Sequence, residues 1–113
     1  IGDLSSLRGL FLHANRLTSV PDSLGKLSSL VQLNLSMNQL TTLPESIGNL
    51  SSLEVLWLQN NQLTTLPESI CNLTNLNWSS EYIGYSYSYI FGNQLCSSIP
   101  PCIIDYADPS NCP

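Results

Sequence analysis

The chain has 113 residues, of which 42% are apolar and only 10% are charged, and its formal net charge is −5. This length accommodates one domain with one core. The only cations are Arg8, Arg16 and Lys26, and so few positive charges argue against nucleic acid or an anionic membrane as the partner. No apolar run approaches the roughly 20 residues that a membrane-spanning helix requires, so we expect no transmembrane segment.

A spacing of 23 residues organises the first two thirds of the sequence. The segments 10–12, 33–35 and 56–58 each have the pattern Leu-x-Leu. Two further columns keep the same spacing, one of asparagines and one of prolines: Asn15, Asn38, Asn61, Pro21, Pro44 and Pro67. Three columns that share one period indicate a repeat architecture rather than an unrelated amphipathic helix.

Each fixed position of the repeat has a physical reason. In Leu-x-Leu, both leucines point inward from a short strand while the residue between them points outward. One repeat cannot bury its leucines alone, so neighbours stack and pair their strands into a parallel sheet with rungs about 4.8 Å apart. The buried asparagine amide bonds backbone groups that the next turn leaves unpaired. Proline then ends the ladder, and Ser-Ile-Gly-x-Leu forms a 3-10 or irregular return.

These motifs resemble the leucine-rich-repeat family, in the Leu-Pro-x-Ser-Ile-Gly-x-Leu variety that is similar to extracellular plant, protist and bacterial proteins. The resemblance covers residues 1–76, and Ile1 falls inside a repeat, so we expect a truncated first repeat in a piece of a longer chain. It implies an α/β solenoid, a horseshoe arc with a short parallel sheet on its concave face and irregular or 3-10 convex segments. It also implies a recognition scaffold that is not an enzyme and needs no cofactor, and the sequence itself shows no catalytic constellation.

The repeat pattern breaks after Leu76. Residues 77–100 form an irregular last repeat: Asn61 and Asn93 are 32 residues apart instead of 23, which indicates an insertion of nine residues. Tyrosines that alternate with serines predict a last strand over Tyr87–Phe91, with the insertion bulging from the entry side of that strand. Irregular capping of the solenoid and a dedicated binding loop both remain open as interpretations of the insertion.

All four cysteines lie in the last third of the chain: Cys71, Cys96, Cys102 and Cys112. Stacking places Cys102 one rung beyond Ser69 and close to Cys71, so a Cys71–Cys102 bridge meets the required separation and leaves Cys96 for Cys112. A Cys102–Cys112 bridge that closes the terminal loop is the alternative. Residues 101–113 resemble the disulfide-bonded cap of secreted family members. Without Cys-x-x-Cys, zinc is disfavoured, and we expect no metal site.

Four sequons have the pattern Asn-x-Ser/Thr, at Asn34, Asn49, Asn72 and Asn77. We expect Asn49 and Asn72 on the convex side and Asn77 in the insertion, all accessible to N-linked glycans. Asn34 points onto the concave face, where a glycan would obstruct binding. Clustered cysteines and sequons together favour an extracellular, secreted or cell-surface location.

The outward strand positions form columns on the concave face. These columns provide the candidate ligand-binding residues, which we predict to be Phe11, Gln32, Asn34, Val55, Trp57, Gln59, Tyr87, Tyr89 and Phe91. Aromatic side chains at solvent-facing positions often mark binding sites. Trp57 and Tyr89 are expected to stack on sugar rings or an extended peptide, while Gln32 and Gln59 donate hydrogen bonds. His13 is interpreted as a surface residue.

Three functional hypotheses follow. The first is an extracellular recognition module that binds a protein, peptide or glycan through the concave face. The second is a structural component of a glycosylated extracellular fibre or cell wall, which self-associates through the uncapped N-terminal end because open strand edges invite stacking. The third, weaker hypothesis is ice binding by a threonine ladder at Thr41-Thr42 and Thr64-Thr65.

Overall fold

The computed structural model describes residues 6–96 and 99–106. Strands alternate with short 3-10 helices along these residues. The strands are β1 (Gly9–Phe11), β2 (Gln32–Asn34) and β3 (Val55–Trp57). The 3-10 helices are η1 (Asp22–Lys26), η2 (Glu45–Asn49), η3 (Glu68–Asn72) and η4 (Pro101–Ile103). Each of the first three turns of the solenoid thus contributes one strand and one 3-10 helix, and the predicted architecture is confirmed.

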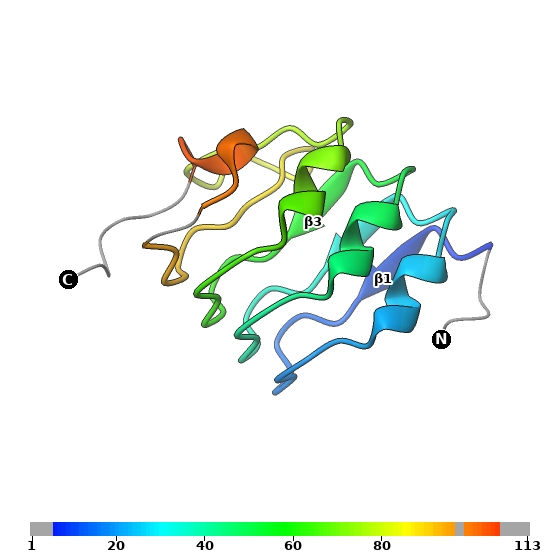
Figure 1. The fold of residues 1–113 in the computed structure, drawn as a ribbon, viewed down its shortest axis with the longest axis horizontal. Coiled ribbons are helices and arrows are strands. Elements are labelled where there is room, and N and C mark those ends of the chain that lie inside the picture. The colour runs from blue at the N-terminus through cyan, green and yellow to red at the C-terminus, as the bar shows by residue number, and fades with distance from the viewer. Residues whose placement is uncertain (1–5, 97–98, 107–113) are drawn as a thin grey trace.

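The strands pair in parallel in the order β1-β2-β3, so that the coils lie side by side along the long axis of the molecule (Figure 1). The register places Phe11 opposite Asn34, and Asn34 opposite Trp57. A single bridge carries the same column on to Tyr89. The predicted concave column is therefore in register over four successive rungs.

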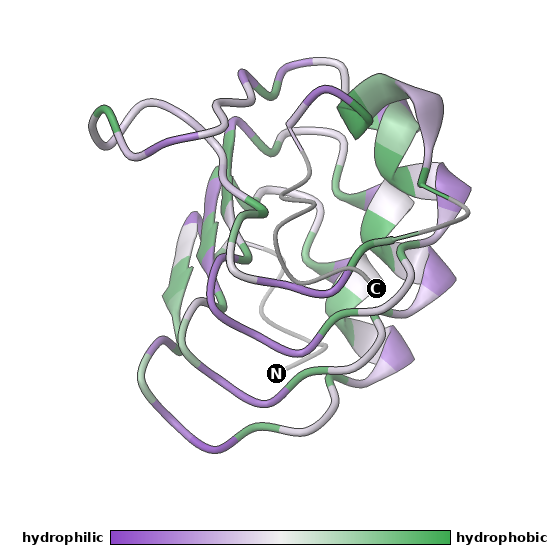
Figure 2. Cartoon of the chain, turned by 90° about the vertical axis from the view of Figure 1, so that its left-hand side faces the viewer, coloured by the Kyte–Doolittle hydropathy of each residue, from purple (hydrophilic) through white to green (hydrophobic). Residues whose placement is uncertain are grey.

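The 3-10 helices form the opposite side of the solenoid, as the end-on view in Figure 2 shows. A proline precedes each of η1, η2 and η3 in extended conformation. Its fixed φ suits this entry position, and its carbonyl accepts the first bond of the turn. In η2, for example, the Ile47 amide donates to the Pro44 carbonyl at 3.1 Å. The proline column thus marks the start of each convex return.

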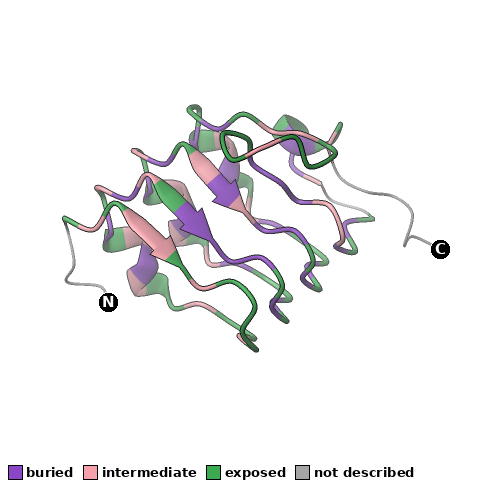
Figure 3. Cartoon of the chain, turned by 180° about the vertical axis from the view of Figure 1, so that it is seen from behind, coloured by how far each residue is buried: buried purple, intermediate pink, exposed green. Residues whose placement is uncertain are grey.

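The core is a continuous stack of leucine and isoleucine side chains between the strands and the 3-10 helices. In β2 and β3, Leu33 and Leu56 are buried to 1% and 0% exposure, whereas the β1 residue Leu10 is half-buried. Buried residues line the inside of the coil, while exposed residues gather at its turns (Figure 3). Leucines of the middle repeats are covered by a neighbouring repeat on both sides, because one repeat alone cannot bury its apolar side chains.

The asparagine column forms the predicted ladder inside the solenoid. The amide nitrogen of Asn61 donates to the carbonyls of Leu58 at 3.1 Å and Leu35 at 2.9 Å, and its oxygen accepts from the Leu40 amide at 3.1 Å. Asn38 and Asn93 repeat this arrangement one rung away on either side. Each buried amide thus satisfies backbone groups of its own repeat and of the preceding one.

The predicted strand over Tyr87–Phe91 does not form, and this segment makes only isolated bridges at Ser88 and Tyr89. Tyr89 continues the ladder, since its amide donates to the Leu56 carbonyl at 3.1 Å and its carbonyl accepts from Leu58 at 2.9 Å. Ser88 instead forms a bridge with Trp78 inside the insertion. The inserted segment pairs with itself before the chain rejoins the sheet, so the ladder has only an isolated bridge at this rung.

The C-terminal region is covalently tied to the solenoid. Cys71 at η3 and Cys102 in η4 form a disulfide with Cα atoms 5.7 Å apart, so the stacking argument predicted the correct pair and the Cys102–Cys112 alternative is wrong. Cys96 is also disulfide-bonded, while Cys112, its expected partner, lies outside the described residues. No helix within the described ranges has the length and hydropathy needed to cross a membrane.

Candidate binding site on the concave face

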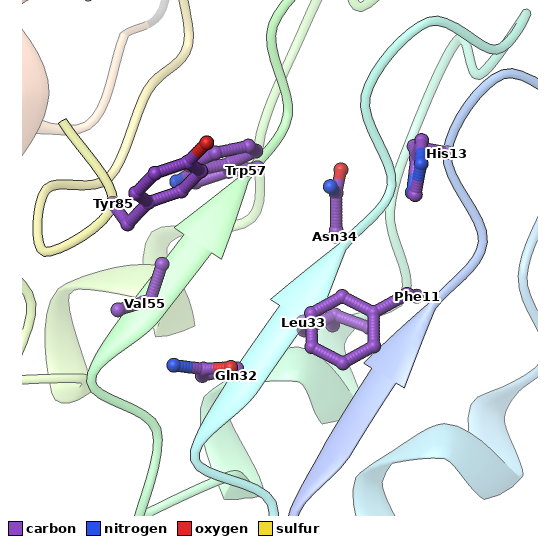
Figure 4. A pocket seen from close by; sticks show the side chains of 8 residues that line it. All are labelled: Phe11, His13, Gln32, Leu33, Asn34, Val55, Trp57 and Tyr85. Atoms are coloured by element: carbon purple, nitrogen blue, oxygen red, sulfur yellow. The ribbon is translucent and has the colours of Figure 1, made fainter.

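A hollow of about 420 Å³ lies on the concave face, over all three strands. Its lining residues are Phe11, His13, Gln32, Leu33, Asn34, Val55, Trp57 and Tyr85. Figure 4 shows the aromatic side chains at two sides, with Asn34 and Gln32 between them. The sheet register explains this layout, because short or polar side chains on β2 separate large rings on β1 and β3.

Phe11 forms one aromatic wall. Phe11 is 57% exposed, a large fraction for an apolar aromatic residue. The ring lies back over Gly9, two residues earlier on the same face of β1, where a Cβ atom would stand 2.9 Å from Cε2 of Phe11. The absence of a side chain at Gly9 therefore makes room for the ring in this position.

Trp57 and Tyr85 form the opposite wall. Their rings stack with centroids 5.8 Å apart and planes 15° apart, an offset arrangement that aromatic pairs favour. Nε1 of Trp57 donates to the Tyr87 carbonyl at 2.8 Å, which ties the insertion to β3. Tyr85 stays 78% exposed, so the second wall of the hollow presents a large apolar face to solvent.

Asn34 supplies a fixed polar group between the two walls. Its oxygen accepts from the Ser36 amide at 3.1 Å and from the Ser36 hydroxyl at 2.7 Å. These bonds settle which end of the amide carries the nitrogen, since only an oxygen accepts from both donors. Nδ2 makes no hydrogen bond within the described residues, so its two N–H groups are available to a ligand.

The hollow carries no fixed charge. None of its eight lining residues is Asp, Glu, Lys or Arg. Beside it, loss of solvent and then the proximity of Tyr85 raise the pKa of the Tyr82 hydroxyl above its ordinary value, so this phenol is neutral at pH 7. An uncharged lining favours an uncharged ligand, since a buried charge without a partner is costly.

Five of the predicted concave residues come together in the hollow: Phe11, Gln32, Asn34, Val55 and Trp57. Gln59, Tyr87, Tyr89 and Phe91 do not line it. Gln59 is 7% exposed, and its Oε1 atom is buried without a hydrogen-bond partner within the described residues.

Tyr89 requires a correction, because its ring does not face solvent. It is completely buried, and the insertion covers it. Its hydroxyl accepts from the Ile83 amide at 2.9 Å and the Gly84 amide at 3.0 Å, and donates to the Gly84 carbonyl at 2.6 Å. Tyr89 therefore anchors the insertion and is not placed to stack on a ligand. The insertion correspondingly folds against the Trp57 ring on the concave face.

Tyr85 lines the hollow but was not among the residues predicted from the sequence, and it is 78% exposed. Tyr85 precedes the predicted strand over Tyr87–Phe91, and the insertion turns back so that it meets Trp57 from outside the ladder. A contact of this kind depends on the path of the insertion and leaves no periodic signal. His13, interpreted as a surface residue, is exposed and also borders the hollow.

The four sequons differ in accessibility. Asn49, Asn72 and Asn77 are exposed. Asn34 is only 8% exposed, and Ser36 holds its amide. A glycan on Asn34 would have to replace this arrangement inside the hollow, whereas the other three asparagines do not line it.

Comparisons with known proteins agree with this architecture. The family model described as "Leucine Rich repeats (2 copies)" matches residues 5–51, and the model described as "Leucine Rich Repeat" matches residues 52–73. A search of curated protein sequences finds no match.

Two solved structures illustrate the likeness. The leucine-rich-repeat protein LIC12759 of Leptospira interrogans is 36% identical, with a TM-score of 0.75 over 88% of this chain. The BIR2 ectodomain from Arabidopsis thaliana is 27% identical, with a TM-score of 0.58 over 79%. The chain spans 23% of the former and 56% of the latter. From the repeat columns, the parallel sheet and the family matches, we conclude that this chain belongs to the leucine-rich-repeat family, whose members generally act as non-enzymatic protein-interaction modules.

Proposed function

We propose that this chain is an extracellular recognition module that binds an uncharged segment of a protein partner in the concave hollow. The observation that carries the proposal is the hollow itself, where Phe11 and the Trp57–Tyr85 pair present exposed aromatic surface around the Asn34 amide. Aromatic anchors in a concave site, with a few fixed polar groups, are typical of recognition sites.

The extracellular part of the proposal has separate support. The Cys71–Cys102 disulfide is of a kind that persists in oxidising compartments. A structural relative is described as an ectodomain, and three sequon asparagines are exposed on the folded chain. N-linked glycans at these three positions would leave the hollow open, since none of the three lines it.

The test begins with a random-peptide library displayed on phage and selected against the wild-type protein. Enriched peptides are then measured by calorimetry against Phe11→Ala, Trp57→Ala and Ile104→Ala. Ile104 is the matched control, because it is 57% exposed like Phe11 but lies on the C-terminal cap. We expect each concave variant to weaken binding about tenfold or more, as truncation of a hot-spot residue does, and Ile104→Ala to leave it unchanged.

Circular dichroism of each variant establishes that the fold survives. Enriched peptides that bind Phe11→Ala and Trp57→Ala as tightly as the wild type would place recognition elsewhere on the molecule and overturn the proposal.

A further inference from the structure

We propose that the concave hollow takes the flat, uncharged ring of one aromatic side chain of the partner, and that the insertion supplies Tyr85 as a specificity-determining wall positioned by Tyr89. This inference rests on the proposed function and names the group that enters the site. Three observations carry it: the spacing of the two aromatic walls, the neutral lining with few polar groups, and the hydrogen bonds that fasten the insertion.

The first observation is the alternation of large and small side chains across the sheet. Phe11, Asn34 and Trp57 lie opposite one another on adjacent strands. Two rungs of about 4.8 Å separate the backbones that carry the two aromatic walls. Because the Phe11 ring lies back over Gly9, the two walls are offset along the strands. A ring placed over β2 would have Phe11 on one side and Trp57 on the other (Figure 4), and favourable aromatic pairs stand roughly 4.5–7 Å apart. This arrangement suits a single flat ring.

The second observation distinguishes an aromatic side chain from a sugar ring. A sugar carries hydroxyl groups around its whole edge, and each one that is buried without a partner costs about 1–3 kcal/mol. The hollow has aromatic walls and aliphatic atoms of Leu33 and Val55. Apart from the Tyr85 hydroxyl at its edge and the Trp57 N–H, which the Tyr87 carbonyl already occupies, its polar side chains are Gln32, Asn34 and His13. An aromatic side chain has few polar atoms to satisfy, and Asn34 Nδ2 is free to donate to the partner's backbone carbonyl.

The third observation is that Tyr85 does not hold its position alone. Four hydrogen bonds fasten the segment around it: three at the buried Tyr89 hydroxyl, and one from Trp57 to the Tyr87 carbonyl. Gly84, the residue before Tyr85, has φ of +136°, a conformation that side chains rarely adopt. The Tyr89 hydroxyl therefore determines where the turn at Gly84 lies, and through it where the Tyr85 ring meets Trp57. Tyr89 is a positioning residue.

The probes for the test are peptides with blocked termini, of the form acetyl-Gly-Gly-X-Gly-Gly-amide, in which X is Trp, Phe, Leu, Lys or Glu, together with cellohexaose. Binding is followed by NMR titration of the backbone amides around Asn34 and Ser36. For the wild type we expect the aromatic peptides to bind about tenfold more tightly than the leucine peptide, since an aromatic pair adds up to about 1.5 kcal/mol beyond area burial. The charged peptides are expected to bind most weakly.

Tyr85→Ala is expected to remove most of this aromatic preference while binding of the leucine peptide stays nearly unchanged. Tyr89→Phe keeps the buried ring and removes only the hydroxyl. It should raise the hydrogen-exchange rates of the Ile83 and Gly84 amides at least about tenfold, the change that corresponds to 1.4 kcal/mol. The Leu35 amide, which donates to Trp57 in the sheet, should remain protected and serves as the internal control.

The outcomes separate the two proposals. If Phe11→Ala weakens the aromatic peptides but Tyr85→Ala does not, the concave site stands and the role of the insertion is overturned. Unchanged exchange at Ile83 and Gly84 in Tyr89→Phe overturns the positioning role. Amide shifts around Asn34 with cellohexaose but with none of the peptides overturn the aromatic-ring assignment. If the peptides selected from the library also bind every concave variant as tightly as the wild type, the proposed function itself fails.

Discussion

Cys71 and Cys102 are bonded at the position where the two preceding pairs of repeats place a glycine against a serine. A Cβ atom on Gly25 would stand 2.6 Å from the Ser46 carbonyl oxygen, and one on Gly48 would stand 2.6 Å from that of Ser69. Cys71 occupies the glycine position of its repeat, and Cys102 occupies the serine position of the next. Their separation is 31 residues, because the insertion lies between them.

The disulfide should contribute substantially to stability. Changing Cys71→Gly together with Cys102→Ser restores the residue pair of the earlier repeats without the covalent bond. The free energy of unfolding in urea is expected to fall by about 3–4 kcal/mol, the chain-entropy effect of opening a loop of this length. A loss below about 1 kcal/mol would show that noncovalent packing alone holds the cap.

The glycine of the repeat should be intolerant of a methyl group. Gly48→Ala would push a Cβ atom against the backbone and side chain of Ser69, and backbone cannot move aside cheaply. We expect the free energy of unfolding to fall by about 1–3 kcal/mol, as for an overpacked core. Glu45→Ala, at an exposed position of the same 3-10 helix, is the control and should change it by less than about 0.5 kcal/mol.

The asparagine ladder should matter most where it is buried. Asn61→Ala leaves the buried Leu40 amide without its side-chain acceptor. It also removes one of two asparagine donors from each of the Leu35 and Leu58 carbonyls, which keep a bond from the neighbouring rung. The unpaired amide costs about 1–3 kcal/mol, and the carbonyls that keep one donor add less, so the total loss should be about 2–3 kcal/mol. The matched control is Asn15→Ala at the same repeat position, where the side chain is exposed and the loss should stay below about 1 kcal/mol. Equal losses in urea unfolding would contradict this account of the ladder.

The turn before each asparagine uses left-handed backbone. Ala14, Met37 and Asn60 have φ of 57°, 55° and 62°, and Gly92 has 71°. Because a side chain is strained in this region, Met37→Gly should be about 1 kcal/mol more stable than Met37→Ala in thermal unfolding. At exposed Gln39, whose φ is not positive, the order should reverse by a similar amount, about 1 kcal/mol. The same order at both positions would show that the φ of residue 37 is not responsible.

Glycan occupancy should follow exposure. When the chain is secreted from a eukaryotic host, mass spectrometry of its peptides is expected to find glycans on Asn49, Asn72 and Asn77 and none on Asn34. The physical reason is that Asn34 is 8% exposed and its amide is bonded by Ser36. Full occupancy of Asn34 in folded protein would mean that the hollow accommodates a glycan instead of an aromatic ring.

The sequence alone determined the solenoid, because each of its rules acts over one repeat. The asparagine column predicted the buried amides that bond the backbone, and the proline column predicted where each 3-10 helix begins. The register of Phe11, Asn34 and Trp57 follows directly from the 23-residue period. Stacking also favoured Cys102 as the partner of Cys71, because corresponding positions of adjacent repeats are neighbours in space, but only the structure decided against the Cys102–Cys112 alternative.

Only the tertiary structure decided what the insertion does. Once the period is broken, sequence position no longer specifies which side chains meet, and the path of the segment depends on contacts with other repeats. Tyr89 and Tyr85 looked equivalent in the alternating pattern, yet one is completely buried as an anchor and the other is 78% exposed against Trp57. The repeat therefore determines the scaffold, Phe11 and Trp57, while the folded insertion adds Tyr85 to the second wall of the hollow.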